Sequence, residues 1–180
     1  MSSGAEGAET AESGGDGNNI VVVEFCEGLE IIRFAAFADC KSLKRVRAPS
    51  TLKVIDQSAF YGCEQLEEVE LCDEGLERIE CSAFSGCKSL KRFTVPSTLK
   101  IIATGAFSGC SQLEEVELCE GLQTIGEDAF DGCKSLKCFK VPSVKLIGKY
   151  AFCDCEQLVG VELHQGIKEI DKSAFYNCFS

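Results

Sequence analysis

The sequence of 180 residues is poor in several residue types, and each shortage excludes a class of protein. It has no tryptophan, one methionine, one histidine and three prolines. No run of about 18 uninterrupted apolar residues occurs, so a membrane-spanning helix is not expected. Met1 to Asn19 has no lysine, arginine or apolar segment, so no secretory signal peptide is visible. We therefore expect no membrane insertion and an intracellular, cytoplasmic location.

Basic residues are also in deficit. The chain carries 18 Lys and Arg against 29 Asp and Glu, which gives a net charge of -11. An acidic surface repels phosphate backbones, so a nucleic acid partner is not expected. The apolar fraction of 45% and the charged fraction of 26% are ordinary for a globular domain. This composition excludes a collagen, a coiled coil and a wholly disordered chain.

The chain divides into two parts. Residues 1–18 are mostly Ser, Gly, Ala and Glu, with no aromatic or β-branched aliphatic residue. Such a segment cannot bury enough apolar surface to offset the entropy lost on ordering, so it is predicted to be a disordered acidic tail. Residues 19–180 are predicted to form a single repeat domain.

A five-residue pattern, A-F-x-x-C, recurs through residues 19–180. Its phenylalanines follow one another at 23 residues, with one interval of 24 and one of 22. The extra residue lies in the segment Cys72-Asp73-Glu74-Gly75, and the missing one lies at Pro142-Ser143-Val144. The seven copies of the pattern contain Phe37, Phe60, Phe84, Phe107, Phe130, Phe152 and Phe175. A fixed period of this length is typical of a solenoid.

Other apolar residues keep step with the A-F-x-x-C pattern. Each of the first six copies is followed by L-x-x-V-x-L or a close variant, and an Ile precedes every copy. Alternation inside L-x-x-V-x-L has period two, so each turn is predicted to carry one short strand. A circuit of 23 residues returns the chain beside its own start. We therefore expect seven parallel strands about 4.8 Å apart in one sheet.

These motifs resemble the leucine-rich repeat, and the A-F-x-G-C and V-P-S-T-L segments look like its BspA type. The resemblance covers residues 19–180. It implies a curved, right-handed solenoid of seven turns, with a parallel sheet on the concave face and short helical or irregular convex segments. It also implies binding to other proteins, including adhesion at microbial surfaces. The chain departs from many leucine-rich repeats because it has no asparagine ladder, with only Asn18, Asn19 and Asn177 present.

Charged side chains flank the central Val or Phe of each predicted strand on one side or on both, and the flanking residues form two columns on the solvent face. Acid faces base across most adjacent strands. One interpretation is a charge-paired sheet that maintains register and solubility, and we favour it for the charges as such. The other is a concave binding surface for a protein partner. The candidate binding residues are Arg45, Arg47, Glu68, Glu70, Arg92, Glu115, Glu117, Lys140 and Glu162.

The sequence has thirteen cysteines, seven of which occupy the anchor position of the repeat. Equivalent residues on adjacent turns lie about 4.8 Å apart, whereas a disulfide needs Cβ atoms about 3.5 to 4.5 Å apart. A ladder of buried, reduced thiols is therefore expected. The best local metal candidate is Cys153-x-Cys155 with His164, but the spacing is weak and we predict no metal site.

Catalytic patterns are not found. A nucleophilic triad would need the single histidine, His164, which falls where other turns have Cys or Pro. No phosphate-binding glycine motif follows a strand. We therefore predict no catalytic residues, no cofactor and no enzymatic activity. The expected function is a protein–protein interaction module, and the alternative is a structural or adhesive repeat protein without a specific ligand pocket.

The carboxyl-terminal turn ends just after its A-F-x-x-C motif, and no further strand covers it. Ile170, Phe175 and Phe179 would then form an apolar edge. Uncovered apolar surface of this kind marks an interaction site. We expect concentration-dependent self-association or partner docking through this turn.

Overall fold

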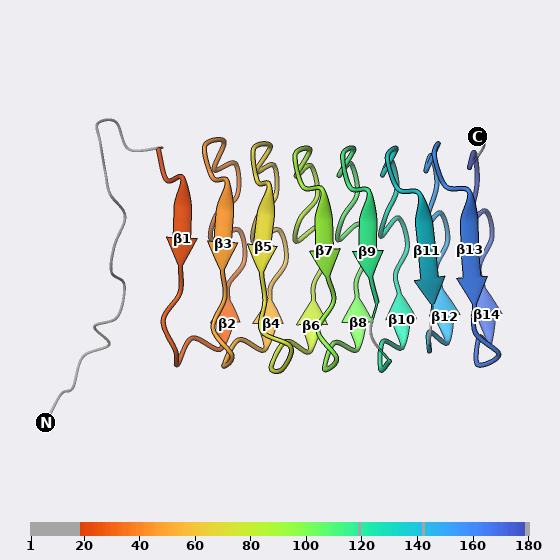
Figure 1. Cartoon of the computed structure of the whole chain (residues 1–180), viewed down its shortest axis with the longest axis horizontal. Coiled ribbons are helices and arrows are strands. Elements are labelled where there is room, and N and C mark those ends of the chain that lie inside the picture. Colours follow the sequence, from red (N-terminus) through yellow and green to blue (C-terminus); the bar gives the residue numbers. More distant parts are fainter. Residues whose placement is uncertain (1–18, 119, 142, 179–180) are drawn as a thin grey trace, which may run out of the picture.

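The computed structural model describes residues 19–118, 120–141 and 143–178, which wind into a solenoid of stacked turns (Figure 1). These residues form fourteen strands, two in each turn, and no helix. The longer strands are β1 (Val22–Glu24), β3 (Arg45–Arg47), β5 (Glu68–Glu70), β7 (Arg92–Thr94), β9 (Glu115–Glu117), β11 (Cys138–Val141) and β13 (Gly160–Leu163). The two-residue strands are β2 (Ile31–Ile32), β4 (Val54–Ile55), β6 (Arg78–Ile79), β8 (Ile101–Ile102), β10 (Thr124–Ile125), β12 (Leu146–Ile147) and β14 (Glu169–Ile170).

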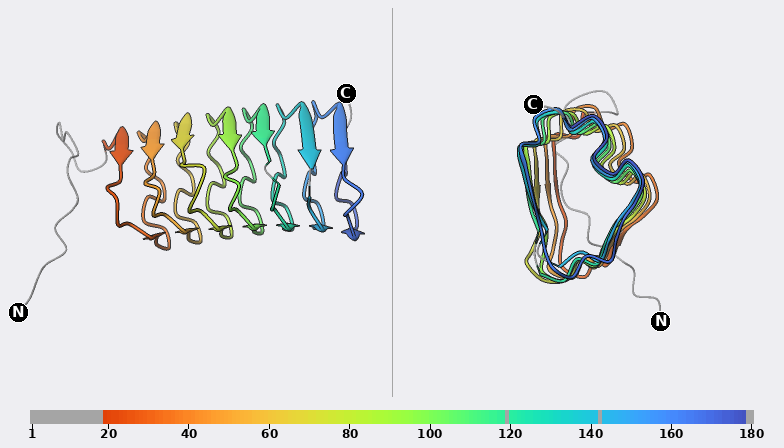
Figure 2. Two further views of the ribbon diagram at one scale, coloured as in Figure 1. Left: turned by 60° about the horizontal axis from the view of Figure 1, so that its bottom comes forward. Right: turned by 90° about the vertical axis from the view of Figure 1, so that its right-hand side faces the viewer.

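The predicted parallel solenoid is confirmed. Viewed along its length, the turns superpose as one closed loop, with the longer strands on one flat side (Figure 2). The prediction of a single strand per turn is wrong, because the two-residue segment that ends in the recurring Ile of each repeat also pairs with its neighbours. A strand of two residues is too short to show the alternation on which the prediction relied.

The strands form three parallel sheets. The two-residue strands make one continuous sheet of seven, in the order β14-β12-β10-β8-β6-β4-β2. The longer strands make two sheets, β1-β3-β5 and β13-β11-β9-β7. The prediction that the longer strands form one unbroken sheet is therefore wrong between β5 and β7. The interruption occurs in the single 24-residue interval of the sequence.

The core is a set of apolar ladders between the sheets. The anchor phenylalanines of successive turns stack with ring centroids 5.1 to 5.3 Å apart. Phe60, Phe84, Phe107, Phe130 and Phe152 are fully buried, together with the Leu and Ile of each internal repeat. Each aromatic pair contributes about 0.5 to 1.5 kcal/mol beyond the free energy of area burial. The turns are thus held together by identical side chains in register.

The A-F-x-x-C segments are irregular turns. The residue before Ala and the residue before Cys both have positive φ in all seven copies, as in Ser58 (56°) and Gly62 (67°). Two left-handed residues per turn prevent a helix from forming. The amides of these segments instead donate to the next turn, as Phe60 N–H does to the Ala83 carbonyl oxygen at 2.8 Å. Of the two predicted convex forms, the structure has the irregular one.

Candidate functional site

The strand face is the outward side of β1, β3, β5, β7, β9, β11 and β13. Each strand turns its central Val or Phe inward and its two flanking residues outward, as in β3, where Val46 is buried between exposed Arg45 and Arg47. The predicted columns lie in the predicted register, since Arg45 pairs with Glu68 and Arg47 with Glu70. All nine candidate binding residues are exposed. The predicted neighbours Glu68 and Arg92 are an exception, because β5 and β7 do not pair.

Ion pairs bridge adjacent strands of the strand face. The Arg47 guanidinium lies 3.3 Å from a Glu70 carboxylate oxygen, and Arg92 lies at the same distance from Glu115. A third pair joins Lys140 and Glu162 at 3.4 Å. These side chains are at least half exposed, so each pair contributes only about 0.2 to 1 kcal/mol. Within the described residues, the candidate residues Arg45, Glu68 and Glu117 form no ion pair.

Sequence reasoning missed a further charged column, which lies one residue before the longer strands. Lys44 contacts Glu67 at 3.9 Å, and Lys137 contacts Glu114 at 2.8 Å. Lys137 lowers the pKa of the Glu114 carboxyl by a side-chain hydrogen bond. The signal in the sequence was the alternation of K-S-L-K with E-Q-L-E or S-Q-L-E in successive turns. The strand face therefore carries three charged columns.

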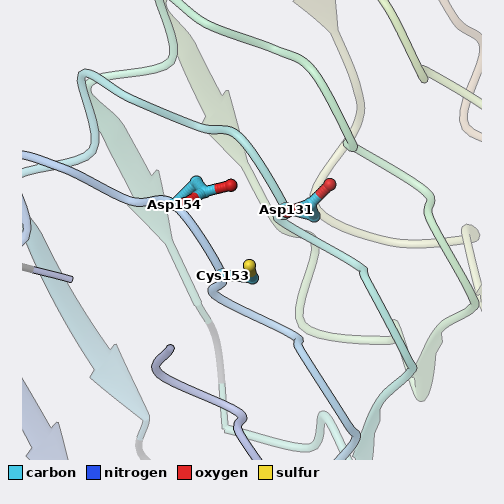
Figure 3. A group of neighbouring side chains, drawn as sticks. All are labelled: Asp131, Cys153 and Asp154. Carbon is cyan, nitrogen blue, oxygen red and sulfur yellow. The ribbon is translucent and has the colours of Figure 1, made fainter. Parts of the chain in front are cut away.

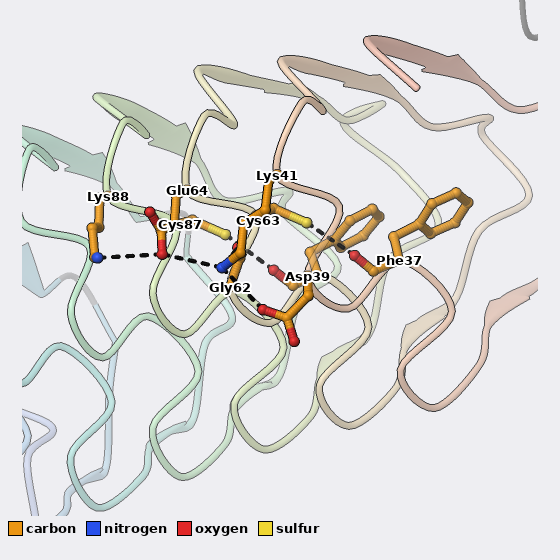
Figure 4. Close-up of polar contacts among 9 residues, drawn as sticks. Phe37, Asp39, Lys41, Gly62, Cys63, Glu64, Cys87 and Lys88 are labelled. Carbon is orange, nitrogen blue, oxygen red and sulfur yellow. Dashed lines mark hydrogen bonds and ion pairs between the residues drawn. The ribbon is translucent and has the colours of Figure 1, made fainter. Parts of the chain in front are cut away.

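A similar network lies where each turn leaves its anchor cysteine (Figure 4). Glu64 is shared by Lys41 at 3.1 Å and Lys88 at 3.4 Å, and Lys41 also contacts Asp39 at 3.0 Å. Hydrogen bonds from the two lysines lower the pKa of Glu64. These ion pairs connect three successive turns of the solenoid.

The strand face is hollowed at the interruption between β5 and β7. The groove has a volume of about 880 Å³ and is lined by residues 67–71 on one side and by Lys91, Arg92 and Thr94 on the other. One lip carries the carboxylates of Glu67, Glu68 and Glu70, and the opposite lip carries two cations. The structure thus places a charged groove within the predicted binding face.

The anchor cysteines form the predicted ladder. Cys63 Sγ–H donates to the Phe37 carbonyl oxygen at 3.0 Å, and Cys87 donates to Phe60 at 3.3 Å (Figure 4). The same bond recurs down to Cys178. Thiol-to-carbonyl bonds thus join successive turns from Cys63 to Cys178.

Burial makes the internal thiols of the ladder poor acids. It raises the pKa of Cys63 to about 12, and it raises that of Cys110 well above the ordinary value of 9.0. The twelve described cysteines are free thiols, and Cys119 lies outside the described residues. The prediction of full burial is wrong for Cys40 and Cys178, which are half-buried because each lies in an end turn.

The predicted weak metal candidate is not assembled. Cys155 is buried and donates to the Phe130 carbonyl oxygen, whereas His164 is exposed and its Nδ1 accepts the Gly166 N–H at 3.1 Å. Within the described residues, one other group could hold an ion, formed by Asp131, Cys153 and Asp154 (Figure 3).

The ligand atoms of this Asp-Cys-Asp group lie within 4.8 Å of one another, and all three side chains are half-buried. Burial and hydrogen bonding to Asp131 raise the pKa of Cys153 to about 12. The thiol therefore holds its proton at neutral pH, which disfavours metal binding because a metal takes the thiolate. The Asn177 side-chain N–H also donates a hydrogen bond to an Asp154 carboxylate oxygen, at 2.5 Å.

The structure describes two of the three residues predicted for the carboxyl-terminal edge. Ile170 is exposed, and Phe175 stacks on Phe152 while remaining half-buried. Phe179 lies outside the described residues, as does the predicted tail 1–18. A shallow hollow of about 280 Å³ lies at this edge and includes Leu158, Phe175 and Cys178 in its lining. Sequence reasoning missed the most exposed apolar side chains of this end, which are those of Val159 and Tyr176.

The described residues contain no helix long and apolar enough to cross a membrane. A comparison with curated protein sequences gives no significant match. Solved structures do match. A leucine-rich repeat protein of T. pallidum is 33% identical with a TM-score of 0.75, covering 84% of this chain and 71% of its own.

Two further solved structures are similar over a smaller share of their length. A leucine-rich repeat protein of Bacteroides ovatus is 27% identical with a TM-score of 0.61, and the match covers 86% of this chain and 49% of the other. A leucine-rich cell surface protein of Faecalibacterium prausnitzii is 28% identical with a TM-score of 0.52, with coverage of 78% and 31%. The family model for the BspA type leucine-rich repeat region matches residues 16–137 and 77–180. This chain therefore belongs to the BspA-type leucine-rich repeat family.

Proposed function

We propose that this protein is a non-enzymatic module that binds another protein through its strand face. The observation that carries the proposal is the set of exposed charged columns held in register on short parallel strands. Side chains fixed on rigid strands lose little entropy on binding, so such a surface is preorganised for recognition. Family membership supports the same role, since repeat solenoids commonly present extended surfaces to partners.

The charge pattern defines what this face would recognise. Acids and bases alternate along the columns, so the long-range field largely cancels and does not steer a partner of one sign. Specificity would instead come from short-range matching of opposite charges. The partner is therefore proposed to carry a complementary alternation of acidic and basic side chains.

Binding should depend on the strand face and not on total charge. One variant combines Arg45→Glu, Arg92→Glu and Lys140→Glu. The control combines Lys53→Glu, Lys100→Glu and Lys145→Glu, exposed residues just before β4, β8 and β12 that change the net charge equally. A partner captured by the wild type, identified by mass spectrometry and then purified should bind the control and lose at least tenfold affinity for the first variant. Equal binding to both variants would contradict the proposal.

An adhesive or structural role is the second candidate. The similarity to a solved structure described as a leucine-rich cell surface protein favours it. An adhesive protein without a specific pocket would bind several unrelated surfaces. Charge reversal on the strand face would then weaken binding no more than charge reversal at Lys53, Lys100 and Lys145 does. Titration of both variants onto coated surfaces therefore separates the two candidates.

We further propose self-association through the carboxyl-terminal edge. Val159 is 69% exposed and Tyr176 62% exposed, an unusual concentration of apolar surface. Sedimentation across a wide concentration range should show dimers that are lost in Val159→Glu. The control is Tyr61→Glu, which alters an exposed side chain in the second turn. A monomer at every concentration, or equal loss of dimer in both variants, would contradict this site.

A further inference from the structure

Exposed apolar surface is concentrated in the first turn (residues 19–40) and the last turn (residues 159–178) of the solenoid, which lie at opposite ends (Figure 1). Nine large apolar side chains are exposed among the described residues, and all but Tyr61 lie in these two turns. Those of the last turn are Val159, Leu163, Ile170 and Tyr176, and those of the first turn are Val21, Val22, Ile31 and Phe34. Apolar surface gathered in this way marks an interaction site, and here it is present at both ends.

The two end turns also carry main-chain groups that inner turns use to bond one another. Inside the solenoid, each anchor Phe donates its N–H to an Ala carbonyl oxygen of the next turn, as Phe60 does to Ala83 at 2.8 Å. The equivalent donor of the last turn is Phe175 N–H, and the equivalent acceptor of the first turn is the Ala36 carbonyl oxygen. Neither has a hydrogen-bond partner within the described residues. The last turn therefore offers a donor where the first turn offers an acceptor.

Hydrogen bonds in the opposite direction show the same complementarity. Asp56 N–H donates to the Ile32 carbonyl oxygen of the preceding turn at 2.9 Å. The equivalent donor of the first turn is Arg33 N–H, and the equivalent acceptor of the last turn is the Ile170 carbonyl oxygen. Among the described residues these two groups are also unpartnered. Such unpaired edges can pair with another chain, and these two edges match each other.

The charges of the two end turns are complementary at two positions of the repeat. Lys168 occupies the position that Glu30 holds in the first turn, and Asp171 occupies the position of Arg33. Within the described residues Lys168, Asp171 and Arg33 form no ion pair, whereas Glu30 pairs with Lys53 at 2.9 Å. A first turn stacked on a last turn in the internal register would therefore bring opposite charges together at both positions.

The same register would extend the apolar ladders of the core from one copy into another. The apolar pairs across the junction would be Phe175 with Phe37, Ile170 with Ile32, and Val159 with Val21. The two rings are half-buried, and in this register they would stack as the inner anchor rings do. Like charges would meet where Glu162 lies over Glu24, but both side chains are exposed, so their repulsion is weak.

We propose that this chain associates head to tail, with the last turn of one copy docked on the first turn of a second copy. The inference rests on the proposed self-association through the carboxyl-terminal edge and assigns it a partner surface. A contact between two last turns would leave the apolar side chains and main-chain acceptors of the first turn uncovered. The head-to-tail contact is heterologous, so a dimer keeps one free end of each kind and larger oligomers form as concentration rises.

The test is sedimentation of the full chain and of two variants, each with one end altered. Val21→Glu alters the first turn, and Val159→Glu alters the last turn. Each variant alone should remain a monomer, whereas an equal mixture should form a 1:1 dimer, because each partner then supplies one intact end. The control Tyr61→Glu should associate as the wild type does. A contact between two last turns predicts instead that Val21→Glu dimerises alone.

A charge swap tests the register and retains the test if a valine variant fails to fold. Arg33→Asp and Asp171→Arg should each weaken association at least tenfold, and the two changes in one chain should restore it. Both side chains are exposed, so the fold should tolerate the changes.

The outcomes separate this inference from the proposal on which it rests. Dimers of Val21→Glu alone, no dimer in the mixture, or no restoration by the charge swap would overturn head-to-tail docking while leaving self-association through the last turn in place. A wild type that is monomeric at every concentration would overturn both.

Discussion

The two sides of the solenoid respond differently to the same extra residue. The sheet of two-residue strands runs unbroken through all seven turns, whereas the sheet of longer strands is interrupted between β5 and β7. The inserted residue lies in the loop that joins β5 to β6, so it adjoins both sheets. Ile79 of β6 is fully buried, whereas Val69 of β5 is not. The more deeply buried side keeps its register, because moving it would expose apolar surface.

Thiol reactivity should give the largest difference between an exposed and an interior position. Cys138 is exposed on β11, whereas Cys110 lies in the core and its pKa is raised by burial. We expect Cys110 to react with a thiol reagent about 1,000-fold more slowly, because it must first be exposed by opening. Site-resolved labelling followed by mass spectrometry measures both rates.

We expect all thirteen thiols to react after denaturation without a reductant, since the twelve described cysteines are free thiols. A lower count would show disulfides and contradict the predicted reduced thiols. Equal rates at Cys110 and Cys138 in the native protein would contradict the buried ladder.

Truncation of the phenylalanine ladder should destabilise both sheets together. Phe107 stacks on Phe84 and Phe130, and it forms a T-shaped pair with the buried Phe93 of β7, with ring centroids 4.7 Å apart. Phe107→Ala is expected to lower the free energy of unfolding by about 3 to 5 kcal/mol. The control Phe175→Ala should cost less, because this ring is only half-buried. Denaturant unfolding measures both, and equal losses would contradict the inferred packing.

The longer loop can be tested at its glycine. Gly75 has φ of 111°, and an added Cβ would clash with the Ser50 carbonyl oxygen. Gly75→Ala should therefore lower stability by about 1 to 3 kcal/mol. Gly28 occupies the equivalent place in the first turn with φ of 99°, but an added Cβ there meets no atom within 4 Å. If Gly28→Ala costs as much in thermal unfolding, the close approach of the longer loop plays no part.

Charge reversal should give the smallest effect. Arg47→Glu removes the ion pair with Glu70 and aligns three acids, because Glu24 lies opposite on β1. We expect a loss of less than about 2 kcal/mol that diminishes in high salt. Lys53→Glu is the matched change beside the other sheet, since it removes a pair with Glu30 at 2.9 Å. No change in melting temperature at low salt for Arg47→Glu would contradict cross-strand pairing.

Much of this architecture was predictable because each turn repeats the same sequence pattern. The seven-fold recurrence of A-F-x-x-C and the Leu, Val and Ile positions predicted the solenoid, the buried ladders and the outward columns. Pairing Arg45 with Glu68 needed only the repeat period. The two-residue strands were not predictable, because Ile101–Ile102 and its equivalents carry no alternating pattern.

The sequence by itself determined which residues share a ladder, because a constant period places equivalent side chains one above another. It also located the longer interval, between Phe60 and Phe84. Only the tertiary structure decided what that irregularity does. Whether an extra residue bulges outward, shifts a register or opens a sheet depends on the free energy of every packed contact around it. Here the sheet of two-residue strands, which contains the buried Ile79, stays paired through all seven turns. The more exposed sheet of longer strands is interrupted, and Lys91 N–H does not bond to the Glu67 carbonyl oxygen.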